Sequence, residues 1–72
     1  MDFHIKLRAL RDKEGSSQSR VAAEIGVTSR QYQRFEAGEQ KPGFDNLLKI
    51  ASYFDVSLDW LMGRTEKREV GR

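Results

Sequence analysis

The stretch around Gly26 constrains the fold more than any other part of the chain. Gly26 can end one helix with a positive φ, and Thr28 is a good N-cap for the next, so that only Val27 separates the two. A connection this short makes two helices meet at a tight angle. It predicts a helix-turn-helix unit, with one helix in residues 18–25 (QSRVAAEI) and the other from about Ser29 to Ala37.

Apolar spacing predicts three further helices and no strand. Phe3, Leu7 and Leu10 recur at spacings of four and three, which is one helical stripe. The stretch 44–54 (FDNLLKIASYF) places its apolar residues at helical spacings, and Ser57 can cap a short last helix, LDWLM. We therefore expect an all-α domain of five helices, in which the second and third form the helix-turn-helix.

The 72 residues are enough for one domain with a small core. Residues 1–63 contain nine basic and nine acidic side chains, whereas residues 64–72 (RTEKREVGR) contain four basic and two acidic ones and carry the whole net charge of +2. These last residues include one apolar side chain, Val70, too little for a packed element. The expected division is a domain over residues 1–63 and a charged, mobile tail over 64–72.

Composition and motifs exclude several classes of function. There is no cysteine and one histidine, His4, so the chain lacks the ligands for a metal cluster. It has no glycine-rich phosphate loop and no nucleophile motif, and we expect neither enzymatic activity, nor a cofactor, nor a small-molecule ligand. Apolar runs of two or three residues are far too short to cross a membrane, and the expected location is the cytoplasm.

The helix predicted at 29–37 separates its side chains into two faces. At 100° per residue, one face carries Tyr32, Phe35 and Glu36. The opposite face carries Arg30, Gln33 and Arg34. Guanidinium and carboxamide groups read base edges in the major groove of DNA, where a good bidentate pair contributes about 1–3 kcal/mol of discrimination. The pattern indicates a DNA-reading helix, and a plain solvated polar face is the alternative.

The order of these features resembles the Cro and phage-repressor type of helix-turn-helix domain, the lambda repressor-like XRE family. The resemblance covers residues 3–63. The residues that carry it are Arg11, Gly15, Ser17, Gln18, Ala22, Gly26, Val27, Thr28, Glu36, Gly38, Lys41, Pro42 and the closing VSLDWLMG. It implies a compact five-helix fold that binds double-stranded DNA.

The resemblance also implies roles for individual residues. Those expected to meet bases are Ser29, Arg30 and Arg34, with Gln31 and Gln33 able to reach bases or phosphates. Those expected to contact the DNA backbone are Gln18, Lys41 and the main-chain amides around Gly43 and Phe44 at the start of a helix. Arg20, where the family often has an acidic residue, is either a further backbone contact or a solvated arginine.

In the same family pattern Arg11 forms an internal ion pair with Glu36. The helical projection supports this pairing independently, because it turns Glu36 inward, where an unpaired carboxylate costs several kcal/mol. Arg11 is then structural and does not contact DNA. Ala37 stands where an asparagine often grips phosphate, so we expect one phosphate contact fewer than the family usually has.

These expectations describe a transcriptional regulator that binds a palindromic operator as a homodimer and represses by occluding a promoter. One recognition helix reads too few base pairs for a genomic site, and such domains usually pair across half-sites about 34 Å apart. Leu58 and Met62 are the expected centre of the dimer contact. The alternative is a protein-interaction module, for instance an antitoxin with autoregulatory DNA binding, which would need an apolar stripe outside the core.

Overall fold

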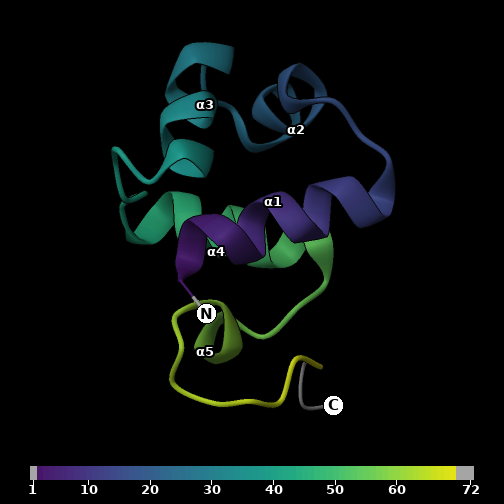
Figure 1. The fold of residues 1–72 in the computed structure, drawn as a ribbon, viewed down its shortest axis with the longest axis vertical. Helices are drawn as coiled ribbons and strands as arrows, with labels where there is room; N and C mark the ends of the chain where they lie inside the picture. Colours follow the sequence, from purple (N-terminus) through teal and green to yellow (C-terminus); the bar gives the residue numbers. More distant parts are fainter. Residues whose placement is uncertain (1, 70–72) are drawn as a thin grey trace.

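The computed structural model describes residues 2–69, which form five helices and no strand. The helices are α1 (Phe3–Glu14), α2 (Gln18–Ile25), α3 (Ser29–Ala37), α4 (Phe44–Phe54) and α5 (Leu58–Leu61). Figure 1 shows α2 and α3 together at one end of the molecule, α1 and α4 across its middle, and α5 with the last described residues at the other end. The predicted all-α fold with a helix-turn-helix is confirmed.

The helix boundaries follow from side chains and glycines that satisfy the backbone at the helix ends. Ser17, Thr28 and Ser57 each accept a hydrogen bond from the main-chain N–H three residues on, and so cap α2, α3 and α5. Gly26 ends α2 with a φ of 77°, which a residue with a side chain adopts only at a cost. The tight connection into α3 depends on this conformation.

All five helices contribute side chains to the core. The largest fully buried side chains among the described residues are Tyr32, Phe35, Leu7, Ile25, Ile50, Leu61 and Val21. Tyr32 and Phe35 belong to α3 and pack edge to face, with ring centroids 6.5 Å apart. Two aromatic rings in the centre of the domain thus anchor α3.

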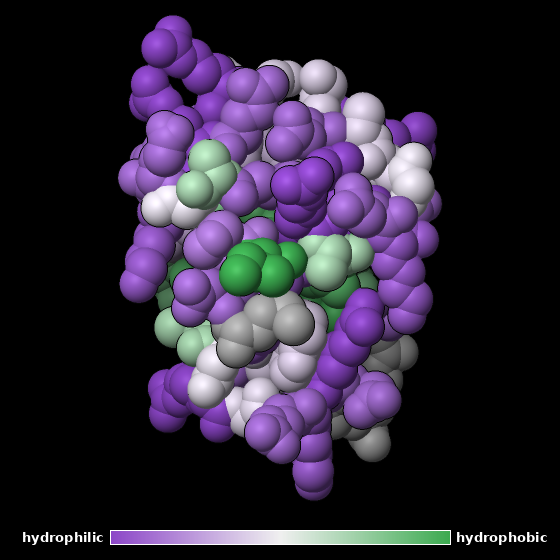
Figure 2. Space-filling view, viewed as in Figure 1, coloured by the Kyte–Doolittle hydropathy of each residue, from purple (hydrophilic) through white to green (hydrophobic). Residues whose placement is uncertain are grey.

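The apolar stripe of α4 is only partly covered. Ile50 and Ala51 are buried, but Phe44 is 63% exposed and Leu48 is 43% exposed. At 100° per residue the stripe is about 160° wide, and Phe44 and Leu48 lie toward one edge of it. A five-helix core this small does not reach that edge. On the face seen in Figure 2, hydrophobic surface gathers in a small central area over α1, among mostly hydrophilic side chains.

Residues 64–69 form no helix and run beside α5. The main-chain N–H of Ser57 donates to the carbonyl of Arg68 at 2.8 Å, and that of Arg64 donates to the carbonyl of Asp59 at 2.7 Å. The Arg68 guanidinium lies 5.4 Å from the centroid of the Trp60 ring. The boundary at residue 63 and the mobility of the tail stay predictions, and residues 70–72 lie outside the described part of the chain.

None of the helices in residues 2–69 has both the length and the apolar character needed to span a bilayer. Residues 2–69 also contain no group of three or more side chains placed to hold a metal ion.

Candidate nucleic-acid interface

The structure places the two faces of α3 as the helical projection predicted. Tyr32, Phe35 and Glu36 are buried. On the other side Arg30, Gln33 and Arg34 are exposed. Packing of the inner face therefore fixes the direction in which two guanidinium groups and a carboxamide project into solvent. A convex helix with such a face has the shape and the donors that fit the major groove.

Two further candidate base-reading residues, Ser29 and Gln31, are half-buried in the first turn of α3. The Ser29 hydroxyl donates to the Ser19 hydroxyl of α2 at 3.2 Å. The main-chain N–H of Gln31 is bonded to the Thr28 cap at 3.0 Å. The start of α3 is thus held against α2 by a side-chain bond that the sequence did not reveal, and it stays accessible at one side.

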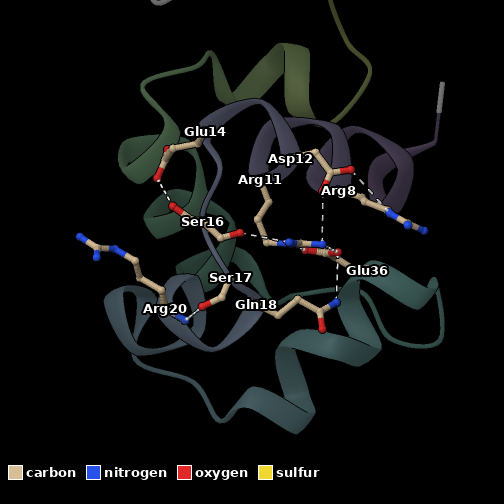
Figure 3. A network of polar contacts seen from close by, with 9 residues as sticks. All are labelled: Arg8, Arg11, Asp12, Glu14, Ser16, Ser17, Gln18, Arg20 and Glu36. Atoms are coloured by element: carbon tan, nitrogen blue, oxygen red, sulfur yellow. Dashed lines mark hydrogen bonds and ion pairs between the residues drawn. The ribbon is translucent and has the colours of Figure 1, made fainter.

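An ion pair between a partly buried guanidinium and a buried carboxylate holds α3 from its inner side. Figure 3 shows Arg11 of α1 reaching the Glu36 carboxylate of α3, with Gln18 of α2 on the same group. Arg11 donates from Nε to Oε2 at 2.6 Å and from Nη2 to Oε1 at 3.0 Å, and Gln18 donates to Oε1 at 3.2 Å. Arg11 also donates a third hydrogen bond, from Nη1 to the main-chain carbonyl of Ser16 at 3.1 Å. This bidentate geometry confirms the predicted Arg11–Glu36 pair and joins three helices at one carboxylate.

The electrostatics of this pair favour its charged form. Burial by itself raises the pKa of Glu36, but the polar side chains around the carboxylate, first Arg11 and then Tyr32 and Gln18, outweigh burial and hold that pKa below its ordinary value. The hydrogen bond to Glu36 raises the pKa of Arg11. Burial raises the pKa of Tyr32, whose hydroxyl meets no hydrogen-bond partner of good geometry among residues 2–69.

A surface hollow lies beside the ion pair, between α1, the start of α2 and the outer side of α3. Its volume is about 560 Å³. The residues that line it are Arg8, Arg11, Ser17, Gln18, Gln33, Glu36 and Ala37. The hollow contains two of the three glutamines of the candidate site, so Gln18 and Gln33 border one concave surface rather than two separate patches.

The candidate backbone contacts lie around the beginnings of α2 and α4. Arg20 and Lys41 are exposed, and Gly43 is the N-cap of α4. Within residues 2–69 no side chain caps this helix start, so its first main-chain N–H groups face outward without a side-chain acceptor. Phe44 is the first residue of α4, and its ring is largely exposed.

The candidate dimer residues belong to α5 and the turn after it, at the end of the molecule away from α2 (Figure 1). Met62, the residue after α5, is 49% exposed, whereas Leu58 is half-buried and packs against the core. Leu61, which lies between these two residues in the sequence, is fully buried. Met62 is therefore the more accessible of the two residues that the sequence selected.

Lys6 is a buried cation that the sequence reasoning missed. It is 7% exposed, and its Nζ donates to the carbonyl of Trp60 at 2.6 Å and lies 4.8 Å from the centroid of that ring. The two residues are 54 positions apart, so helical periodicity contains no signal for the contact. Lys6 ties α1 to α5 and takes no part in the α3 surface.

Comparisons with known proteins agree with this geometry. A helix-turn-helix family model matches residues 7–61. The chain is 37% identical over 64 residues to the cryptic phage CTXphi transcriptional repressor RstR of Vibrio cholerae. The matched region covers 89% of this chain and 57% of RstR. The chain spans about half the length of the curated relatives that it matches.

Two solved structures are also similar. The P22 c2 repressor, in complex with a synthetic operator, matches with a TM-score of 0.84 and 25% identity over 90% of this chain and 98% of that one. A transcriptional regulator from Listeria innocua matches with a TM-score of 0.83 and 30% identity over 99% of this chain and 64% of the other. The chain therefore belongs to the helix-turn-helix family, in the Cro and phage-repressor (XRE) type of DNA-binding domain.

Proposed function

We propose that this chain binds double-stranded DNA sequence-specifically and represses transcription as a homodimer on a palindromic operator. The observation that carries the proposal is the exposed face of α3, where Arg30, Gln33 and Arg34 project from a helix whose other side is buried. The P22 c2 repressor, which shares the fold, forms a complex with a synthetic operator. RstR is a transcriptional repressor.

In this proposal the two kinds of contact have different tasks. Side chains of α3 read base edges: Ser29, Arg30, Gln31, Gln33 and Arg34. Groups around it hold phosphates and set the register: Gln18, Arg20, Lys41 and the main-chain amides at Gly43 and Phe44. The Arg11–Glu36 pair touches no DNA but keeps α3 at a fixed angle to α1.

Dimerisation supplies the second half-site. A second copy would meet this one at the α5 end, through Met62 and the accessible part of Leu58, in a two-fold contact. Such a contact is small, so operator DNA completes the assembly that free protein forms weakly.

The antitoxin alternative has less support. It needs a continuous apolar stripe outside the core, and the large exposed hydrophobic residues of the described chain lie on three different helix regions. They are Ile5 on α1, Phe44 and Leu48 on α4, and Met62 after α5.

Selection of bound duplexes from a random DNA pool tests the proposal. The expected result is a consensus with two-fold symmetry and half-sites about one helical turn apart. Recovery of an asymmetric consensus would contradict the dimer, and recovery of no consensus would contradict sequence-specific binding.

A further inference from the structure

The hollow beside the recognition helix contains a cation that the roles given above leave out. Arg8 lines this hollow together with Gln18, Gln33 and Ala37. Figure 3 shows it extending from α1 beside the Arg11–Glu36 pair. Gln18 and Gln33 face DNA in the proposed function, so the hollow opens toward the duplex.

The charges around the hollow single out Arg8. Arg11 and Glu36 also line it, but they neutralise each other through a bidentate bond. Arg8 is 71% exposed in its side chain, and its Nε lies 3.8 Å from Asp12 Oδ2, which is at the long end of the ion-pair range. An exposed pair of this kind contributes little, so the guanidinium can exchange its carboxylate partner for a phosphate.

Ala37 supplies the second part of the argument. It lines the same hollow and offers only a methyl group there. Of the residues that α3 contributes to the hollow, Gln33 carries a neutral donor and Ala37 none, so α3 provides no cation there and Arg8 of α1 is the cation without a buried partner. We propose that Arg8 contacts a DNA phosphate in this hollow and so adds, from α1, a cationic contact beside α3.

This proposal rests on the proposed DNA binding, and salt dependence tests the two together. Each phosphate that a cation neutralises contributes about 0.9 to the slope of log affinity against log salt. Binding of the selected duplex and of a random duplex is measured by fluorescence anisotropy from about 50 to 200 mM salt. Arg8→Ala should lower the slope by about 0.9 and weaken both duplexes alike.

Two variants on α1 serve as controls. Lys13→Ala removes an equal charge from an exposed position that does not line the hollow, and its slope should stay at the parent value. Asp12→Asn removes a carboxylate that lies 3.8 Å from Arg8 and 3.6 Å from Arg11, and it should tighten binding of both duplexes in the parent chain more than in Arg8→Ala. Equal slope losses for Arg8→Ala and Lys13→Ala would overturn the proposal, because bulk charge would then explain them.

A neutral linkage locates the contact. A methylphosphonate is placed at each backbone position of the half-site in turn, and the parent chain is compared with Arg8→Ala. At one position the neutral linkage should weaken binding of the parent chain but not weaken binding of Arg8→Ala any further, because the variant has no cation to meet the phosphate there. If the losses add at every position, Arg8 meets no phosphate and the proposal fails. A parent chain that binds neither duplex overturns the proposed function as well.

Discussion

The α2–α3 part and the α4–α5 part of the molecule differ in how completely they cover their apolar side chains. Val21, Ile25, Tyr32 and Phe35 of α2 and α3 are all 1% exposed or less. In the α4–α5 part Ile50 and Leu61 are buried as well, but Phe44, Leu48 and Met62 are each more than 40% exposed. In the α2–α3 part, the buried apolar side chains fix a helix that displays polar groups. In the α4–α5 part, some apolar side chains remain exposed to solvent.

This difference indicates a division of labour. A reading helix must hold its side chains in a fixed geometry, because misplaced donors lose hydrogen bonds to base edges. A surface that meets a second subunit must instead keep accessible apolar area. The predictions below test the comparison, beginning with the change of largest expected effect.

The largest effect should come from Phe35→Ala. This ring is fully buried, and its removal should lower the free energy of unfolding by about 3–5 kcal/mol. Phe44→Ala removes the same ring from an exposed site and should cost less than about 0.5 kcal/mol. Urea unfolding followed by circular dichroism measures both, and Phe35→Leu replaces the first variant if it does not fold. Similar losses of unfolding free energy at the two sites would remove the contrast between the α2–α3 part and the α4–α5 part.

The next effect concerns Glu36→Gln. It leaves the Arg11 guanidinium buried against a neutral group, and the loss of stability should reach about 3 kcal/mol. Because the folded-state pKa of Glu36 is lowered, its contribution is present above the unfolded pKa of about 4.3 and is lost as pH falls through the folded value. Melting temperature between pH 7 and acid should therefore fall less steeply in the variant. An unchanged midpoint at pH 7 would mean that the pair adds nothing.

A smaller effect, confined to DNA binding, is expected for Arg34→Ala. Loss of one bidentate contact should weaken the selected duplex by about 1–3 kcal/mol, mainly at one base pair. Lys41→Ala should weaken selected and random duplexes alike and lower the salt slope by about one unit. Anisotropy titrations on single-base variants of the site distinguish the two. Equal losses on all sequences for Arg34→Ala would place it among the phosphate contacts.

The smallest effect on the fold should come from Met62→Asp. The side chain is half exposed, so monomer stability should change by less than about 0.5 kcal/mol. Binding of two chains to one palindromic duplex should nevertheless be lost, as sedimentation with DNA would show. A variant that still binds two to one places the interface elsewhere, and Phe44 and Leu48 are then the surface to examine.

The helices were predictable from sequence because their ends are local. Ser17, Thr28 and Ser57 bond to main-chain groups three residues away, and Gly26 needs no distant partner for its conformation. The inward direction of Glu36 was also predictable, because the helical period within α3 places it on the same side as Tyr32 and Phe35.

Contacts between distant residues were not predictable in the same way. Lys6 looks like any surface lysine until α5 is placed beside α1, and its partner is 54 residues away. The exposure of Phe44 depends on how far a small core extends around α4, which periodicity does not contain. Arg8 became a candidate only when the hollow brought it together with Ala37.

The position of Trp60 gives the protein an internal optical probe. Trp60 is the only tryptophan in the sequence, and its half-buried ring has the Lys6 ammonium at 4.8 Å and the Arg68 guanidinium at 5.4 Å. Its emission therefore reports on the junction of α1, α5 and residue 68 at the end of the molecule away from α3. Release of residues 64–69 would change the indole's surroundings while the helices stay folded, so fluorescence and circular dichroism together separate detachment of that segment from unfolding.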